Sequence, residues 1–163
     1  MSAKPIRTAV LLAAGAGTRF WPYNVVRQKA AFPIANVPAL RRTVDALLEL
    51  GLSRIVVVVG HGEPSVRAAL RGAAGQIRYV RQPALEGTAS AALLGAQGLE
   101  EDLLVVAGDV VTDPQNLSAL LSRFAAHRPL AATLIQPLGQ ERPHDWIAAF
   151  PDGEVSPYDD PFG

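Results

Sequence analysis

Five β-branched residues follow one another without interruption at positions 55–59, in the sequence Ile-Val-Val-Val-Val. A run of this kind has no polar side, so it is typical of a parallel strand that is covered on both faces. The run therefore predicts one strand of a layered α/β sheet.

Strand and helix signals alternate along the chain on either side of this run. Short apolar runs predict further strands at residues 8–12, 77–80, 103–107 and 131–135. Helical spacing of apolar residues, alanine enrichment, and proline or glycine at the ends predict helices at residues 38–50, 88–97 and 114–127. Strands joined by helices form right-handed βαβ units, so we expect a Rossmann-like three-layer α/β/α fold with a mainly parallel sheet. Residues 146–150 and 154–156, around Asp152-Gly153, predict a hairpin after this unit.

The composition limits the classes of function. The chain has 163 residues, 15 basic and 15 acidic side chains and no cysteine. A net charge of zero provides no long-range field for nucleic acid or an anionic membrane, and the absence of cysteine excludes disulfides and thiolate chemistry. With no apolar signal core and no run of membrane-spanning length, we expect a single cytoplasmic domain without nucleic-acid or membrane partners. The oligomeric state is left open, and a homo-oligomer is compatible with the sequence.

The loop after the first predicted strand has the composition of a phosphate-binding site. It contains Gly15, Gly17 and Arg19 in the sequence Leu-Ala-Ala-Gly-Ala-Gly-Thr-Arg. Small residues let backbone N–H groups approach phosphate oxygens, both glycines permit backbone angles that a Cβ would forbid, and arginine adds a permanent charge. The dinucleotide-binding fingerprint would need glycine where Phe20 stands, and no Gly-Lys-Ser or Gly-Lys-Thr of a Walker A motif is present.

Three further segments share an order and spacing with this loop. They are Lys29 before Pro33-Ile34 and Pro38, Gln82 before Gly87-Thr88-Ala89, and Gly108-Asp109 after a strand. Together the four segments resemble the signature of the sugar-1-phosphate nucleotidyltransferases, over almost the entire chain. The resemblance implies a nucleotidyltransferase fold of the GT-A-like type.

The resemblance also implies a reaction and a set of roles. A sugar 1-phosphate would attack the α-phosphorus of an NTP and give an NDP-sugar and pyrophosphate, without a protein nucleophile. Arg19 and Lys29 would be the catalytic cations, Asp109 would bind Mg²⁺, and the 87–89 segment favours UTP or dTTP. The residues implied in nucleotide binding are Leu12, Ala13, Ala14, Gly15, Gly17, Thr18, Gln82, Gly87, Thr88 and Gly108.

The sequence departs from the family pattern mainly toward the C-terminus. Asn36-Val37-Pro38 replaces a Gly-Lys-Pro turn, Ile147 stands where glycine is usual, and Asp160 aligns with a lysine that would meet the sugar phosphate. The family's second metal-binding aspartate would lie beyond Gly163. We therefore expect a nucleotide-binding portion at residues 1–136, a partial sugar-binding portion at 137–163, and truncation at the C-terminus.

Two alternatives remain beside the enzyme. One is a non-catalytic nucleotide-binding subunit of the same fold, which the changes at Ile147 and Asp160 favour. The other is a molybdenum-cofactor-type guanylyltransferase. We expect Trp21 and Trp146 to be packing residues, and His61 and His144 to have no part in the site.

Overall fold

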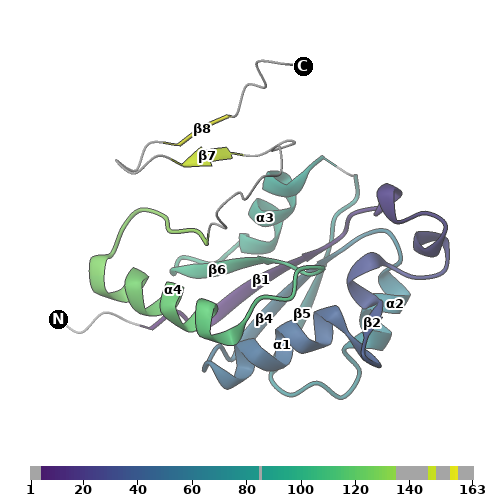
Figure 1. The fold of residues 1–163 in the computed structure, drawn as a ribbon, viewed down its shortest axis with the longest axis horizontal. Helices are drawn as coiled ribbons and strands as arrows, with labels where there is room; N and C mark the ends of the chain where they lie inside the picture. Colours follow the sequence, from purple (N-terminus) through teal and green to yellow (C-terminus); the bar gives the residue numbers. More distant parts are fainter. Residues whose placement is uncertain (1–4, 85, 135–146, 150–154, 158–163) are drawn as a thin grey trace. The chain divides into compact units, whose positions relative to one another are not determined.

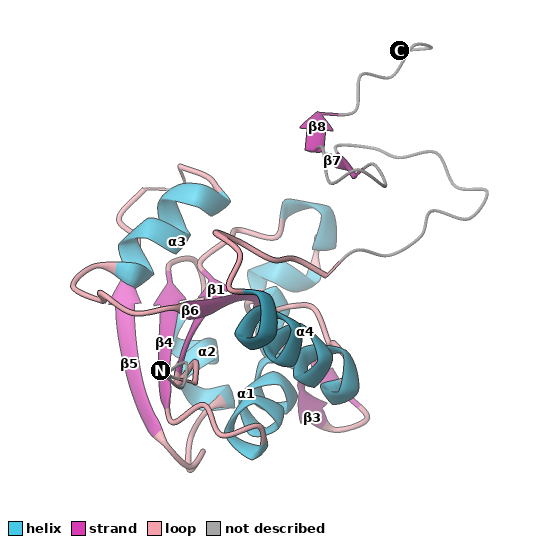
Figure 2. Ribbon diagram, turned by 90° about the vertical axis from the view of Figure 1, so that its left-hand side faces the viewer, coloured by secondary structure: helices cyan, strands magenta, loops and turns pink. Residues whose placement is uncertain are grey.

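The computed structural model describes residues 5–84, 86–134, 147–149 and 155–157, which belong to two units, Met1–Ala132 and Thr133–Gly163. The first unit contains a four-stranded parallel sheet with the order β5-β4-β1-β6. Its strands are β1 (Thr8–Ala13), β4 (Arg54–Val59), β5 (Gln76–Arg81) and β6 (Leu103–Ala107). The parallel sheet predicted from the sequence is confirmed, and Figure 2 shows β4 and β5 pointing the same way.

Helices cover both faces of this sheet. Figure 1 shows α3 (Thr88–Ala96) on one side, and α1 (Ala39–Glu49), α2 (Glu63–Ala69) and α4 (Pro114–His127) on the other. Along β4, Ile55, Val57 and Val59 pack with α1, α2 and α4, whereas Val56 and Val58 pack with α3. Each of these five side chains is at most 4% exposed. The run is apolar without interruption because the side chains on both faces of β4 are buried. Burial of each one stabilises the fold by about 1.5–3 kcal/mol.

The ends of the helices follow local sequence signals. Pro38 caps α1, and Gly51 follows its end with φ of +88°. Helix α4 has proline in its first turn, and the carboxylate of Asp113 accepts a hydrogen bond from the N–H of Gln115 at 2.8 Å. Such a cap satisfies one N–H that the helix itself leaves free and typically contributes about 1 kcal/mol.

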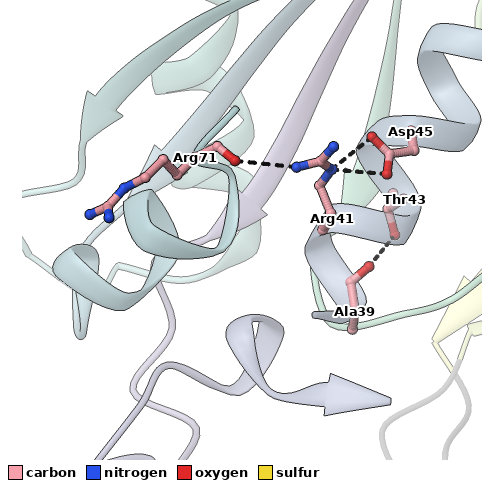
Figure 3. Close-up of polar contacts among 5 residues, drawn as sticks. All are labelled: Ala39, Arg41, Thr43, Asp45 and Arg71. Carbon is pink, nitrogen blue, oxygen red and sulfur yellow. Dashed lines mark hydrogen bonds and ion pairs between the residues drawn. The ribbon is translucent and has the colours of Figure 1, made fainter. Parts of the chain in front are cut away.

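Helix α1 is also joined to the segment that follows α2. Figure 3 shows the guanidinium group of Arg41 between the carboxylate of Asp45 and the carbonyl of Arg71. Its Nε lies 2.8 and 2.9 Å from the two carboxylate oxygens, and an Nη donates to the carbonyl oxygen at 3.3 Å. These contacts fix one side of the helical layer under the sheet.

Two sequence predictions about elements need correction. Helix α2 was missed because it has only seven residues and one fully buried apolar side chain, Val66. The strand predicted at residues 131–135 is wrong for 131–134, which form no strand, and Ile135 lies outside the described residues. Apolar residues form a strand only where a neighbouring strand supplies backbone hydrogen bonds, and no strand in the described part of the chain pairs with residues 131–134.

The described residues also form two small hairpins. In the first unit, β2 (Pro33–Ile34) pairs with β3 (Val37–Pro38) across Ala35 and Asn36, whose φ angles are +48° and +65°. In the second unit, β7 (Ile147–Ala149) pairs antiparallel with β8 (Val155–Pro157), which confirms the predicted pairing. The turn at Asp152-Gly153 and residues His144, Trp146 and Asp160 lie outside the described residues.

No described helix is long and apolar enough to cross a membrane.

Candidate functional site

A cavity of about 580 Å³ lies at the carboxyl ends of the strands. The loop after β1, the start of η3 (Lys29–Ala31), the segment from Gln82 into α3 and the turn after β6 contribute to its wall. Parallel strands bring these segments together because their carboxyl ends share one edge of the sheet. The wall includes eleven of the thirteen residues that the sequence predicts for the site: Leu12, Ala14, Gly15, Gly17, Thr18, Arg19, Lys29, Gln82, Gly87, Thr88 and Asp109.

The other two predicted residues, Ala13 and Gly108, do not line this cavity. Side chains alternate along a strand, so Ala13 points into the core below the sheet and is 1% exposed. The N–H of Gly108 donates to the carbonyl of Leu12 at 2.9 Å, and a Cβ added at Gly108 would lie 3.0 Å from that oxygen. Glycine at this position therefore allows the turn that carries Asp109 to pack closely against β1.

Helix α1 supports the same turn. The Cδ1 of Leu40 would lie 3.1 Å from a Cβ on Gly108. The buried hydroxyl of Thr43 lies 3.2 Å from the carbonyl of Ala39, as Figure 3 shows, and 3.4 Å from the carbonyl of Val110. Packing in the helical layer thus fixes the backbone on both sides of Asp109.

The two glycines of the first loop differ in conformation. Gly17 has φ of +61°, which confirms the prediction that a side chain would be strained there. Gly15 does not use this conformational freedom, because its φ is not in the left-handed region, and a Cβ would meet nothing within 4 Å. The absence of a side chain at Gly15 therefore leaves open space at the cavity wall.

Lys29 and Asp109 form an ion pair across the cavity, with 2.8 Å between Nζ and Oδ2. Their side chains are 47% and 32% exposed, so solvent screens the pair and its contribution to stability is about 1 kcal/mol or less. Such a pair can open at small cost when a charged ligand enters. No group of three or more His, Cys, Asp or Glu side chains that could hold a metal ion exists among the described residues. Asp109 would therefore share a cation with oxygens from water or from a ligand.

The opposite part of the wall presents amide groups. Gln82 is 6% exposed, its N–H donates to the carbonyl of Val59 at 2.8 Å, and its Nε2 lies 3.5 Å from the carbonyl of Gly87. Gly87 has φ of +93°, with open space where a Cβ would be, directly before α3. A flat ligand could therefore approach this backbone closely and pair with the side-chain amide.

Five residues in the wall were not predicted: Ala16, Phe20, Gln28, Ala91 and Ala107. Ala91 could have been found, because it lies three residues after Thr88 on one side of α3. Phe20 belongs to an aromatic cluster with Tyr23 and Phe32, at centroid distances of 5.6 and 4.8 Å. The predicted packing role of Trp21 is wrong, since this side chain is 73% exposed.

A profile of the MobA-like NTP transferase domain family matches residues 9–150 of the chain. The chain belongs to this family. The matched range contains every residue of the cavity wall, from Leu12 to Asp109.

Individual relatives of this MobA-like NTP transferase domain confirm the resemblance to sugar-1-phosphate nucleotidyltransferases. The bifunctional protein GlmU of Sorangium cellulosum is 37% identical over 148 residues, covering 83% of the chain and 31% of GlmU. The CMP-5'-(3-aminopropyl)phosphonate synthase of Streptomyces rubellomurinus is 34% identical over 150 residues, covering 82% of the chain and 23% of that enzyme. The chain thus spans a third or less of the length of these two relatives.

The same fold occurs in solved nucleotidyltransferases. A structure described as UTP-bound UGPase from Acinetobacter baumannii superposes with a TM-score of 0.63 at 25% sequence identity. The superposition covers 76% of the chain and 54% of that structure. The α/β nucleotidyltransferase fold expected from the sequence is therefore confirmed.

Proposed function

We propose that the cavity binds an NTP and catalyses nucleotidyl transfer to a sugar 1-phosphate, forming an NDP-sugar and pyrophosphate. The observation that carries this proposal is the meeting of three chemistries in one cavity. A glycine-containing loop with Arg19, the cation Lys29 beside the carboxylate Asp109, and the amide of Gln82 beside Gly87 all contribute to its wall. These are groups for a triphosphate, a divalent cation and a nucleobase.

The wall fits a reaction that depends on charge compensation. An oxygen of the sugar phosphate would attack the α-phosphorus, and the bond from that phosphorus to the leaving pyrophosphate would break. Arg19 and Lys29 would stabilise the negative charge on the departing phosphates.

Asp109 is the residue proposed to hold Mg²⁺. Magnesium commonly binds one or two carboxylates together with substrate phosphate oxygens, which fits a single carboxylate in a cavity wall. The bound ion would neutralise phosphate charge and orient the oxygens around it. Because Asp109 pairs with Lys29, binding of Mg²⁺ and the nucleotide would separate these side chains and leave Lys29 for the phosphates.

UTP or dTTP is the proposed nucleotide. Gln82 offers one donor and one acceptor, a pattern that can match the edge of uracil or thymine. Support comes from the structural neighbour described as bound to UTP and from the relative that is named as a synthase of a CMP conjugate. Both names refer to pyrimidine nucleotides.

Two measurements on the purified chain test this proposal. Calorimetry would give the affinity for UTP, dTTP, CTP, GTP and ATP with Mg²⁺, and a coupled assay would follow pyrophosphate release with a panel of sugar 1-phosphates. Release with UTP or dTTP supports the enzyme, whereas tight binding with no release supports the non-catalytic subunit. Selective binding of GTP would favour the guanylyltransferase, and no binding of any NTP would overturn the proposal.

One matched pair of variants locates the site. Arg19→Ala should weaken UTP binding about 10- to 100-fold, the usual range for loss of a charge-assisted hydrogen bond. Arg123→Ala, on the exposed surface of α4, is the control and should bind UTP like the unaltered chain.

A further inference from the structure

Three consecutive carbonyl groups of the loop after β1 are each held by a donor from another segment. The carbonyl of Ala14 accepts from the backbone N–H of His61 at 3.1 Å. The carbonyl of Gly15 accepts from Nε2 of Gln28 at 3.4 Å, and that of Ala16 accepts from Nδ2 of Asn24 at 3.1 Å. The oxygens of this segment are thus engaged with the protein.

The N–H groups of the same loop are in the opposite situation. Within the described part of the chain, no acceptor is found for the backbone N–H groups of Gly15, Ala16, Gly17 and Thr18, all of which line the cavity. Free N–H groups on successive residues attract anions, whereas free carbonyl oxygens would repel them. The loop therefore depends on outside donors to keep its polarity suited to phosphate.

Asn24 is the most informative of these donors. It does not line the cavity, and its Oδ1 is buried without a hydrogen-bond partner among the described residues. A buried oxygen in this state reduces stability, so stability alone does not account for an asparagine here. Its backbone carbonyl also lies 3.1 Å from Nε2 of His61, the residue whose N–H holds Ala14. His61, for which the sequence predicted no role, therefore contacts both the carbonyl of Ala14 and the backbone of Asn24.

Gln28 connects the loop to the segment of Lys29. Its side chain is 5% exposed and uses both ends, donating to Gly15 and accepting from the N–H of Ala30. Its own N–H donates to the hydroxyl of Ser65 in α2 at 2.9 Å. The side chain of Gln28 therefore links the loop to the start of η3, and its backbone N–H links the same residue to α2.

We infer that Asn24 and Gln28 are positioning residues, which hold the carbonyls of Ala16 and Gly15 so that the loop presents its N–H groups to the phosphates of the nucleotide. This inference rests on the proposed function. Neither residue needs to touch the nucleobase, so their effect is confined to ligands with a polyphosphate chain.

The variant Asn24→Leu separates positioning from a structural role. It removes the donor to Ala16 and also the unpartnered oxygen, with a side chain of similar size, so the melting temperature should stay unchanged or rise. Affinity for UTP with Mg²⁺ should fall about tenfold, the usual order for one lost polar contact, while affinity for uridine stays the same. The matched control Asn116→Leu makes the same change at an exposed position of α4 and should alter neither affinity.

The possible results distinguish failure of this inference from failure of the proposed function. Equal UTP affinity in Asn24→Leu and the unaltered chain would overturn the inference alone, as would parallel losses of UTP affinity, uridine affinity and melting temperature. If the unaltered chain binds no NTP, the proposed function is overturned as well. An NMR measurement on the unaltered chain does not depend on the folding of the variant. The amide resonances of Gly15 and Gly17 should shift when UTP is added and should not shift when uridine is added. The reverse pattern would contradict the inference.

Discussion

The two faces of the central sheet differ in how fully helices cover them. On the face of α1, α2 and α4, residues from all four strands pack with the helices, including Leu11 and Val57 at 0% exposure. On the other face α3 packs over β1 and β4, while Val105 of β6 is 43% exposed. On this less covered side, Leu12, Ala14 and Ala107 line the cavity together with Ala91 of α3.

The difference indicates that one face of the sheet contributes mainly to ligand binding and the other mainly to stability. A ligand cavity needs wall surface that is not buried by the protein itself, and partial cover by a single helix leaves such surface beside α3. The densely packed face then provides most of the stability that holds the loops in place. Substitutions on the two faces should therefore separate effects on stability from effects on binding.

The largest effect is expected for Leu47→Ala on the dense face. Leu47 of α1 is 0% exposed, and removing a buried leucine side chain typically costs about 2–5 kcal/mol of unfolding free energy. Urea denaturation would measure this loss. Under conditions where the variant is folded, UTP affinity should equal that of the unaltered chain, and a fall in affinity comparable to the loss of stability would contradict the separation of the faces.

This layered fold could be predicted from the sequence because its main signals are local. The strand at residues 103–107 and the helix at 114–127 were predicted with the bounds that the structure shows. Local signals failed where the decision depends on distant partners. Residues 131–134 are apolar enough for a strand, yet none of the described strands pairs with them. Helix α2 is too short to show a clear period.

The cavity wall was predictable to the extent that its chemistry lies in short motifs. Arg19, Lys29, Gln82 and Asp109 all line the cavity, although they lie far apart in the sequence. The support by Asn24, Gln28 and His61 could not be predicted, because it consists of side-chain and backbone contacts to carbonyls between segments up to tens of residues apart. An asparagine or glutamine carries no periodic signal that would reveal such a partner.

A smaller and mixed effect is expected for Gly95→Ala on the face of α3. Alanine favours a helix by about 1 kcal/mol over glycine, but the new Cβ would overlap Val10 Cγ1 and lie 2.8 Å from Val58 Cγ2. Overpacking of this kind costs about 1–3 kcal/mol, so a net loss of roughly 1 kcal/mol is expected. Because α3 carries Thr88 and Ala91 into the cavity wall, UTP affinity should fall as well. Unchanged UTP affinity together with reduced stability would show that the position of α3 does not determine how the cavity wall binds UTP.

A still smaller change in stability is expected for Asp109→Asn. The ion pair with Lys29 is partly exposed, so its loss should cost about 1 kcal/mol or less in urea denaturation. The dependence of UTP affinity on Mg²⁺ should weaken strongly, because an amide is a poorer ligand for the ion than a carboxylate. Asp45→Asn removes a carboxylate that pairs with Arg41 on α1 and serves as the control; equal Mg²⁺ dependence in both variants would exclude Asp109 as the metal ligand.

The smallest effect is expected for Val105→Thr, compared with the same substitution at Val57. Threonine keeps the β-branched shape, so each variant differs from the unaltered chain mainly by one hydroxyl. At Val57, which is 0% exposed, the hydroxyl would be buried among apolar side chains and should cost about 1–3 kcal/mol of unfolding free energy. At Val105, which is 43% exposed, water can bond the hydroxyl and the change should stay within about 0.5 kcal/mol. Urea denaturation of the two variants side by side measures the difference in cover directly, and equal losses would mean that β6 is covered on this face in solution.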